Sequence, residues 1–536
     1  MLESFWSAVA PAVIVSGALS LLVESLLRPK LRPFWRRRAA ALAMHGGLWL
    51  LLLTVLLLVL QRPVFAATAL LAGLLFVVLV SNAKYQALRE PFIFQDFEYF
   101  SDALKHPRLY LPFLGTVRAV LAVAAFAAAL VAGLALEESL LASLPADDFL
   151  TGSAVLATAG ILLMTLAARA KPAVTLDAAS DLRQLGLLTA LWRYGEEELA
   201  PWRAPRDFAV PFDEATNGPA AISTQPHLVV VQSESFFDAR RLYPGIRSDL
   251  LREFDALQAA AACRGQVEVA AWGANTVRTE FAFLSGLAGE SLGIHRFNPY
   301  RRLAAQGIAT LASFLQHRGY RTVCVHPYSA SFYSRDRLFP RLGFDQFIDI
   351  RDFAGAARSG PYVGDLAVAE KVCCLLHDAS EQPLFVLVIT MENHGPLHLE
   401  KLRSGDVERL YSQPPPGGCD DLTIYLRHLG NADRMAGRLR AGLDAVPRAG
   451  GLCWFGDHVP IMPGVYRALG EPGGQTDYFI WRKGGSQGPG VPLDLKIEDL
   501  GRRFLQEMGL LGSGDGVAPS SNLAVAGRVR AASPDG

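Results

Sequence analysis

One stretch of the sequence combines a hydroxyl nucleophile with the start of a helix. In Trp272-Gly-Ala-Asn-Thr-Val-Arg-Thr-Glu-Phe281, a β-rich run stops at glycine and asparagine, and a helical pattern begins directly after Thr276. The first turn of a helix presents unpaired N–H groups and the positive end of the helix dipole, so it would stabilise an anion beside the Thr276 hydroxyl. Ordinary helix capping explains an Asn-Thr pair equally well. Thr276 is therefore a candidate phosphate-attacking nucleophile that needs support from other residues.

Two predicted strands end in side chains that bind hard metal ions. Glu234 closes the apolar run Val229–Ser235, and Asp457 and His458 follow a second apolar run and a glycine. Together with the Thr276 oxygen they would form a mostly oxygen site with one imidazole, which suits Mn²⁺ or Mg²⁺ better than a thiolate-selected metal. A solvated acid at a strand end, or a chance Asp-His pair, is the structural alternative for each motif alone. In combination the motifs predict a bound metal ion that stabilises the alkoxide form of the Thr276 hydroxyl.

Two further strand ends carry groups suited to phosphate. His394 lies in a loop after the run Leu387–Thr390, where it could bind phosphate or protonate a leaving alkoxide, although a lone histidine is more often structural. Arg335 follows the run that ends at His326, and its planar guanidinium could bind phosphate oxygens. A surface ion pair between Arg335 and the adjacent Asp336 is the structural alternative.

All these candidates lie in a part of the chain that alternates short β-rich runs with helical ones. Such alternation predicts an α/β sandwich with a largely parallel sheet, in which polar groups meet beyond the carboxyl ends of the strands. The predicted strands are His227–Gln232, Gln266–Trp272, Arg321–His326, Leu384–Thr390 and Gly451–Phe455. The predicted helices are about Thr279–Leu287, Ile308–Gly319, Asp365–Asp378 and Leu422–Leu443.

Before residue 170 the sequence is more apolar than that of a soluble protein. The 536-residue chain is 51% hydrophobic, and this excess is concentrated in the N-terminal third. Five runs are long and apolar enough to cross a bilayer: about Phe5–Leu27, Ala39–Leu60, Val64–Ser81, Ala119–Leu136 and Phe149–Ala168. Buried core helices are the alternative, but five such runs so close together favour a membrane domain.

Four regions are expected along the chain. Residues 1–170 form the membrane domain, and residues 171–225 form a proline-containing linker with a helix near Asp181–Tyr194. Residues 226–511 form the α/β domain, and residues 512–536 form a disordered tail rich in Gly, Ser, Ala and Pro. The connection 82–116 mixes aromatic and charged residues, which suits either the headgroup layer or a covered loop.

Loop charges bear on which side of the membrane the α/β domain lies. The linker Arg28–Arg38 carries six Lys/Arg and no acid, whereas the connection 137–148 is acidic. If all five runs cross, the basic linker and the start of the α/β domain share one side. The positive-inside rule would make that side cytoplasmic.

The overall composition excludes some classes of partner. Lys+Arg and Asp+Glu balance at 51 each, so no global basic field recruits nucleic acid, and no nucleic-acid-binding signature occurs. The 6 cysteines all lie in the C-terminal part without zinc-like spacing, and they are expected to be buried apolar residues. A disulfide among them would require an oxidising compartment.

Taken in chain order, the motifs resemble those of the lipoteichoic acid synthase and phosphoglycerol transferase family, within the alkaline phosphatase/sulfatase superfamily. The order is an apolar strand with Glu-Ser, then Asn-Thr-x-x-x-Glu-Phe, Phe-x-x-Arg-Asp, Asn-His-x-Pro and Gly-Asp-His. The resemblance covers about residues 226–510, and it implies a sulfatase-like fold for this region. Five membrane spans before the domain also suit it.

The resemblance implies a role for each candidate residue. A manganese-type ion would be held by Glu234, Thr276, Asp457 and His458, with Thr276 as the nucleophile. Arg335 and His394 would contact the phosphoglycerol, and His326 is a looser match to another substrate contact. Tyr333 stands where several members carry tryptophan, so the glycerol pocket differs in detail.

The resemblance also implies partners and a location. A phosphatidylglycerol-type lipid would donate glycerol phosphate to an envelope glycan or glycolipid, through a phosphothreonine-type covalent intermediate. Family members work outside the cytoplasmic membrane, so a periplasmic or otherwise extracytoplasmic domain on the inner membrane is expected, against the charge count. The charge count and the expected location would agree if one run did not cross the membrane. The tight turn Gln61–Pro63 makes the second and third runs the candidates.

Other activities fit the motifs less well. A sulfatase proper would need Cys or Ser in a C/S-x-P-x-R context, and no such string occurs. A phosphoethanolamine transferase uses a similar metal-threonine site, but the matching cysteine pattern around Thr276 is missing; it ranks ahead of a plain phosphodiesterase. A non-enzymatic membrane scaffold would be signalled by loss of a metal ligand, and all four are present.

Overall fold

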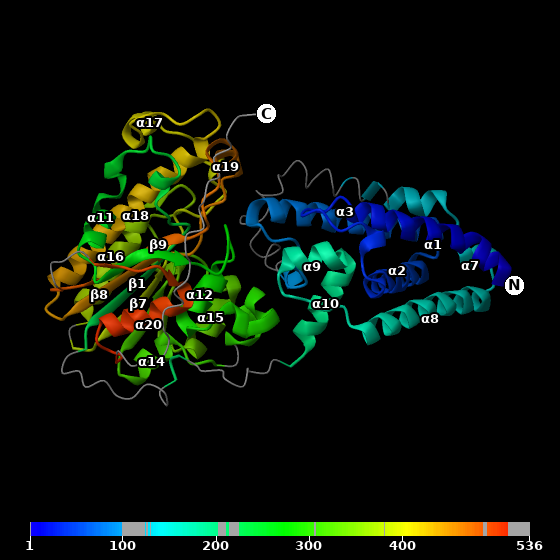
Figure 1. The fold of residues 1–536 in the computed structure, drawn as a ribbon, viewed down its shortest axis with the longest axis horizontal. Helices are drawn as coiled ribbons and strands as arrows, with labels where there is room; N and C mark the ends of the chain where they lie inside the picture. The colour runs from blue at the N-terminus through cyan, green and yellow to red at the C-terminus, as the bar shows by residue number, and fades with distance from the viewer. Residues whose placement is uncertain are drawn as a thin grey trace, which may run out of the picture.

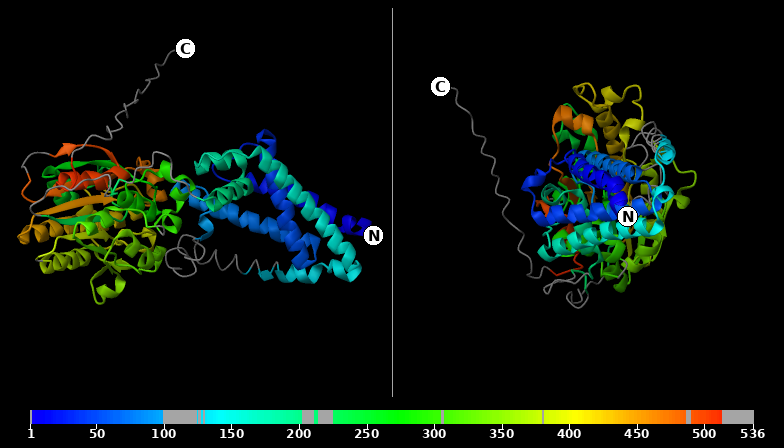
Figure 2. Two further views of the ribbon diagram at one scale, coloured as in Figure 1. Left: turned by 90° about the horizontal axis from the view of Figure 1, so that it is seen from below. Right: turned by 90° about the vertical axis from the view of Figure 1, so that its right-hand side faces the viewer.

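The protein has a helical N-terminal part and an α/β C-terminal part, which lie end to end along its long axis (Figures 1 and 2). The computed structural model describes residues 2–98, 130–201, 211–213, 225–304, 307–379, 381–485 and 490–512, with positions 124, 127 and 128. The N-terminus lies at the end of the helical part that is remote from the α/β part (Figure 2).

Among the described residues of the N-terminal part, four helices are long and apolar enough to cross a membrane: α1 (Leu2–Glu24), α2 (Ala39–Leu60), α3 (Pro63–Leu88) and α8 (Ala146–Ala170). They correspond to four of the five predicted runs. Most of the remaining run, Ala119–Leu136, lies outside the described residues. Because α2 and α3 both meet the length and hydropathy of a span, the suggestion that one of them falls short is not supported.

The turn between α2 and α3 is built on helix-end chemistry. Gln61 ends α2 in the left-handed conformation, and Pro63 opens α3, where its missing N–H is not needed. The Glu137 carboxylate accepts hydrogen bonds from the backbone N–H groups of Val64 (2.9 Å) and Phe65 (2.7 Å). An acid of the 137–148 connection therefore satisfies the start of α3 and complements its dipole.

The predicted linker contains two helices, α9 (Ala178–Leu185) and α10 (Leu187–Leu199), where the sequence predicts one. Earlier in the chain, the short helix α7 (Leu140–Ser143) precedes α8. Apolar side chains of α9 and α10 pack with Leu27, Trp49 and Phe92 from the membrane helices and their loops. In the 82–116 connection, residues 82–88 belong to α3, and the loop after them is covered, since Phe92 and Ile93 are buried. Residues 99–116 lie outside the described residues.

A nine-stranded, mostly parallel sheet forms the centre of the α/β domain, as predicted. Its strand order is β10-β2-β9-β8-β1-β7-β3-β4, with β11 beside β2. The strands are β1 (His227–Ser233), β2 (Cys263–Glu268), β3 (Arg321–Val325), β4 (Gln346–Ile348), β7 (Leu384–Ile389), β8 (Gly450–Gly456), β9 (Thr476–Arg482), β10 (Val491–Pro492) and β11 (Leu495–Lys496). A separate hairpin pairs β5 (Arg358–Ser359) with β6 (Tyr362–Val363).

Two details of the sheet differ from the sequence-based expectation. The predicted strand Gln266–Trp272 is centred too late, because β2 ends at Glu268 and the residues after it lead into the Thr276 loop. Strands β4, β9, β10 and β11 have no predicted counterpart, and β9 pairs antiparallel with both β8 and β2. The strands that carry the predicted site residues are nevertheless parallel neighbours: β1 lies between β7 and β8, and β3 lies beside β7.

Helices cover both faces of the sheet (Figure 1). Alternate β1 residues point to opposite faces: Val229 and Val231 pack with α11, α16 and α18, whereas Leu228 and Val230 pack with α12, α14 and α20. The helices of the domain are α11 (Arg252–Ala259), α12 (Thr276–Ser285), α13 (Pro299–Arg302), α14 (Leu311–His317), α15 (Arg335–Leu338), α16 (Asp365–Asp378), α17 (Asp406–Leu410), α18 (Asp420–Ala445), α19 (Pro463–Leu469) and α20 (Ile497–Glu507). A core on each face fixes the strand ends where the candidate residues lie.

Candidate active site

The carboxyl ends of four adjacent parallel strands bring the predicted residues to one edge of the sheet. Glu234 follows β1, Asp457 and His458 follow β8, and His326 follows β3. His394 lies in the loop after β7. Because β1 is paired on one side with β7 and on the other with β8, these loops share the same edge.

Glu234, Asp457 and His458 form a compact buried cluster. Each offers one ligand atom, and these three atoms lie within 4.8 Å of one another. The Nε2 atom of His458 is 3.7 Å from Oε1 of Glu234 and 3.3 Å from Oδ2 of Asp457. Two carboxylates and an imidazole at this spacing form a candidate site for a divalent metal ion.

Hydrogen bonds orient each of these side chains toward the shared centre. The Nδ1–H of His458 donates to the Val459 carbonyl at 3.1 Å, and this contact turns Nε2 toward the two carboxylates. Ser235 donates its N–H to Oδ1 of Asp457 (2.8 Å) and its hydroxyl to Oε1 of Glu234 (2.8 Å). Such outer contacts fix ligand orientation in metal sites.

The negative charge and burial of the cluster favour the binding of a cation. Oδ2 of Asp457 is buried and has no hydrogen-bond partner among the described residues, and Nε2 of His458 lies 3.3 Å from it. Burial, and secondly the nearby Asp457 carboxylate, raise the pKa of Glu234 to about 8. A bound divalent ion would reverse both penalties, so the residues fit a metal, with Mn²⁺, Mg²⁺ and Zn²⁺ all compatible with the donor set.

Thr276 is the first residue of α12 and is half-buried. The preceding Asn275 adopts the left-handed conformation (φ 65°), and in the described structure its side chain makes no capping hydrogen bond. Simple asparagine capping therefore does not account for the Asn-Thr pair. One turn later, the Thr279 hydroxyl donates to the Asp457 carbonyl at 2.9 Å, which ties the helix that carries Thr276 to the loop that carries two candidate ligands.

Arg335 is buried rather than paired at the surface with Asp336. Its side chain donates to Glu280 of α12, with Nη2–Oε2 at 2.7 Å and Nε–Oε1 at 3.2 Å. Its Nη1 lies 3.3 Å from Nε2 of His326, whose Nδ1 is 3.0 Å from the Ile389 carbonyl. The Arg335 charge lies near enough to Glu234 to act against the rise in the pKa of that carboxyl. Arg335 is thus a fixed positive charge beside the cluster.

The two other predicted histidines are both neutral bases. Burial, and secondly the Arg335 charge, hold the pKa of His326 well below its usual range. Burial also lowers the pKa of His394. The Nδ1–H of His394 donates to the Gly395 carbonyl at 2.7 Å, so its Nε2 is left as an acceptor. His394 is therefore better prepared to receive a proton from a hydroxyl than to donate one.

Several residues that shape the site were not singled out from the sequence. Ser235, Thr279 and Glu280 all lie inside the motifs, but their roles depend on contacts with distant segments. Ser235 adopts the left-handed conformation (φ 53°), a strained backbone state that is common at functional sites. No sequence pattern indicates this strain, whereas the Glu280 position is marked by the Asn-Thr-x-x-x-Glu-Phe motif.

The helix that carries Thr276 also contacts the segment leaving the membrane helix α3. Arg278 donates to the two carboxylate oxygens of Glu90 at 2.8 and 3.0 Å, and its Nε donates to the Phe297 carbonyl at 3.0 Å. The Phe297 ring stacks on Tyr194 of α10, with centroids 5.6 Å apart. The site is thereby fixed to the membrane part through buried contacts.

Comparison with known proteins agrees with this fold. The sulfatase family matches residues 226–507, more than half of the chain. The chain therefore belongs to the sulfatase family, which confirms the superfamily resemblance drawn from the motifs.

Three relatives illustrate the range of the family. The capsular polysaccharide biosynthesis protein RkpI of Rhizobium meliloti is 32% identical over 261 residues, which is 48% of this chain and 45% of RkpI. A putative cyclic beta-1,2-glucan modification protein of the same organism is 26% identical over 254 residues, 47% of this chain and 38% of that protein. The chain thus spans less than half the length of these two relatives.

The third relative is a solved membrane protein. The lipooligosaccharide phosphoethanolamine transferase EptA of Neisseria meningitidis has a TM-score of 0.53 and 13% identity, covering 94% of this chain and 95% of EptA. The likeness shows that the membrane helices and the α/β domain follow the same overall fold. Taken together, these findings describe a sulfatase-family chain in which membrane helices precede the α/β domain and a buried cluster of Glu234, Asp457 and His458 forms a candidate metal site.

Proposed function

We propose that the chain is a phosphoglycerol transferase that moves glycerol phosphate from a phosphatidylglycerol-type lipid to an envelope glycan or glycolipid. The observation that carries this proposal is the placement of Thr276. It stands at the start of α12, and Thr279 of the same helix is bonded to the loop of the buried Asp457–His458 pair. The choice of phosphoglycerol as the transferred group rests on the motif resemblance. The names of the two relatives in Rhizobium meliloti support a polysaccharide acceptor.

The proposed reaction has two displacement steps at phosphorus. In the first, the Thr276 hydroxyl loses its proton and its oxygen bonds to phosphorus, while the bond from phosphorus to the diacylglycerol oxygen breaks and that oxygen takes up the proton, which releases diacylglycerol. In the second, an acceptor hydroxyl loses its proton and bonds to phosphorus, and the bond from phosphorus to the Thr276 oxygen breaks as that oxygen regains a proton. The result is a glycerophosphoryl acceptor and a regenerated enzyme.

The residues of this chain take distinct roles in the proposal. Glu234, Asp457, His458 and the Thr276 oxygen would hold a divalent ion, which when bound lowers the cost of an alkoxide and of phosphoryl negative charge. Arg335, held by Glu280, places a fixed positive charge where phosphate oxygens approach. His394, with Nε2 free to accept, receives the proton of the acceptor hydroxyl. His326 orients Arg335 through its Nε2.

The proposal also places the α/β domain outside the cytoplasm, on the far side of the inner membrane. Both the lipid headgroup and an envelope glycan are available there. The same placement puts the basic linker Arg28–Arg38 outside, against the positive-inside rule. Reporter fusions after Gly512 that are active on only one side of the membrane test this orientation, and activity of a cytoplasmic reporter alone would contradict it.

The chemical test uses the full chain with Mn²⁺ and labelled lipid. With phosphatidylglycerol as donor, we expect diacylglycerol release and a glycerophosphorylated Thr276 peptide, both detected by mass spectrometry. Thr276→Ala should keep its metal and form neither product, whereas Thr276→Ser, which retains a hydroxyl, should form both more slowly. Near-normal turnover by Thr276→Ala would instead indicate direct hydrolysis by water.

A parallel reaction with phosphatidylethanolamine distinguishes the alternative transferase. The phosphoglycerol proposal expects little diacylglycerol from this lipid and no phosphoethanolamine on Thr276. Faster turnover of phosphatidylethanolamine, with that group on the Thr276 peptide, would keep the covalent mechanism and replace the donor. The two halves of the proposal can therefore fail separately.

A further inference from the structure

The loop between α1 and α2 exposes aromatic rings and positive charges together. The Trp35 side chain is 70% exposed and Phe34 is 41% exposed. Five basic side chains of the same loop are also exposed: Arg28, Lys30, Arg32, Arg36 and Arg38. None of them belongs to the active site. We call these seven residues the basic–aromatic loop.

The base of this loop is firmly held. Arg37, the remaining basic residue of the segment, is buried in a salt bridge with Glu24, with Nη1–Oε2 at 2.6 Å. The Arg32 N–H donates to the Arg183 carbonyl of α9 at 2.9 Å, and Leu27 and Leu31 pack with Leu182. The exposure of the basic–aromatic loop is therefore a property of a fixed segment.

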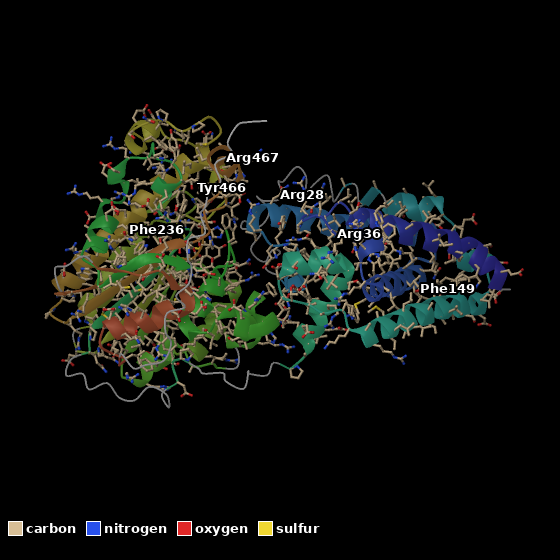
Figure 3. The ribbon with its side chains drawn as sticks, in the orientation of Figure 1. Arg28, Arg36, Phe149, Phe236, Tyr466 and Arg467 are labelled. Atoms are coloured by element: carbon tan, nitrogen blue, oxygen red, sulfur yellow. The ribbon has the colours of Figure 1, made fainter. Side chains whose placement is uncertain are left out.

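The loop lies toward the α/β domain. In Figure 3, the labelled Arg28 and Arg36 lie between Phe149, at the remote end of the helices, and the α/β domain with its labelled Phe236 and Tyr466. Leu22 and Leu26, in the last turns of α1 and just beyond it, are 58% and 57% exposed, as expected of side chains that face lipid. The loop therefore follows directly from a lipid-facing surface, at the height where a bilayer's headgroups begin.

Arg37 and its five neighbours differ in what they contact. Arg37 has an internal partner, whereas Arg28, Lys30, Arg32, Arg36 and Arg38 form no ion pair with any residue of the described ranges. Exposure of a tryptophan side chain to water is unfavourable. Its position in the headgroup layer is favourable, because an indole ring prefers the boundary between apolar and polar surroundings. Clustered Lys and Arg at that layer are attracted to anionic lipids.

We infer that the basic–aromatic loop binds the anionic headgroups of the bilayer leaflet nearest the α/β domain. The inference concerns lipid binding and holds whichever group the enzyme transfers. The basic loop lies on the same side of the membrane as the α/β domain. If that domain is extracytoplasmic, the positive-inside rule disfavours basic residues there, and lipid binding gives a reason for their presence. The charges would be retained there because they hold acidic lipid close to the enzyme.

The test measures lipid preference of the full chain in uncharged detergent. Phosphatidylglycerol and phosphatidylethanolamine are mixed in known ratio, and the lipids retained on the purified protein are quantified by mass spectrometry. The loop variant carries Arg28→Gln, Lys30→Gln, Arg32→Gln, Arg36→Gln and Arg38→Gln. A matched control removes four exposed arginines and one exposed lysine from the α/β domain: Arg252→Gln, Lys401→Gln, Arg403→Gln, Arg434→Gln and Arg467→Gln.

We expect the loop variant to lose at least about tenfold in its preference for phosphatidylglycerol, because each basic residue near a headgroup contributes to the attraction. The control should keep the preference of the unaltered protein, and added salt should weaken that preference. An equal preference in loop variant and unaltered protein would overturn the inference. So would a loop variant that loses binding of an anionic glycan while its lipid preference is unchanged.

A second variant guards against a loop change that simply unfolds the protein. Replacing the four arginines of the loop by lysine preserves its charge, and this variant should keep most of the preference for phosphatidylglycerol. Trp35→Phe supplies an independent measurement, since quenching of tryptophan fluorescence by lipids brominated near the headgroup should decrease relative to the unaltered protein. No decrease would place Trp35 in water and contradict the inference.

Discussion

Two buried clusters of acids and histidine lie in the α/β domain, and they differ in how their carboxylates are hydrogen-bonded and how their charge is balanced. In the first, Glu234, Asp457 and His458 face one another, and Oδ2 of Asp457 has no hydrogen-bond partner within the described part of the chain. In the second, His428 of α18 lies between two carboxylates, with Nδ1 2.9 Å from Glu392 and Nε2 3.0 Å from Glu400.

The difference lies in which cluster supplies its own positive charge. Burial opposes protonation of His428, but the hydrogen bonds that its ring donates to Glu392 and Glu400 outweigh burial and raise the pKa of His428 to about 9. Arg427 adds a second cation on Glu400, at 2.7 Å. In the first cluster the pKa of Glu234 is raised instead, and Oδ2 of Asp457 has no hydrogen-bond partner among the described residues. Composition alone does not separate a metal site from a structural ion-pair network, whereas the balance of charge and hydrogen bonds does.

The largest predicted effect tests this distinction directly. Asp457→Ala should abolish metal binding and lower turnover by at least about 10³-fold, more than the loss of a single preorganised donor. Glu392→Gln, in the second cluster, should leave metal content unchanged. Elemental analysis of the purified proteins decides the matter, and equal metal in the Asp457 variant and the unaltered protein would rule out the assignment.

The pair of Arg335 and Glu280 extends the comparison to a site residue with an internal partner. Glu280→Gln leaves the Arg335 charge buried without its carboxylate, which should cost about 3–5 kcal/mol of unfolding free energy. Turnover should fall as well, because Arg335 loses its orientation. Thermal unfolding and initial rates measure the two effects. A Glu280 variant with unchanged stability would mean that the ion pair does not form in the folded protein.

The His428 network predicts a dependence of stability on pH. The pKa of His428 is about 9 in the folded protein and near 6.5 when unfolded, so folding favours the protonated form. The resulting stabilisation is fully present below about pH 6.5 and is lost as pH rises through about 9, with an upper limit of about 3 kcal/mol. Melting curves of the unaltered protein and His428→Gln, recorded from pH 6 to 10, should converge at the alkaline end. Parallel curves would exclude a charged His428.

The smallest predicted effect concerns the contact between the membrane part and the active site. Arg278→Gln should lower turnover only several-fold, because Thr279 still holds α12 to Asp457. Glu90→Gln should act similarly, and the double variant should cost little more than either single one, as a coupled pair requires. Additive losses would show that the two residues act independently.

The sequence is most informative where a motif and its partner are both local. Glu234, Asp457 and His458 follow short apolar strands, and the ends of parallel strands meet at one edge of a sheet, so the sequence alone predicts that these three residues lie together. The alternating pattern also predicts a largely parallel sheet. Strand β9 is missed although its run Thr476–Arg482 is rich in aromatic residues, because alternation of strands and helices does not anticipate an antiparallel insertion.

Contacts between distant segments cannot be predicted in this way. The Arg335–Glu280 pair joins two helices that are far apart in the chain, and the sequence suggests the adjacent Asp336 instead. His428 lies on a long helix with no motif around it, so nothing marks it as the partner of Glu392. The contact of Glu90 with Arg278 requires knowing how the membrane helices meet the α/β domain. Such pairs depend on tertiary packing rather than on periodicity.

The Glu90–Arg278 contact has a consequence for the reach of the enzyme. Glu90 lies 2 residues beyond the last residue of α3, and Arg278 lies 2 residues beyond Thr276, so a short run of covalent and ionic links connects the membrane helix to Thr276, the proposed nucleophile. These links act as a spacer that sets the height of Thr276 above the bilayer. An enzyme with its nucleophile at a fixed height selects substrates by how far their phosphate stands from the membrane surface, in addition to their chemistry.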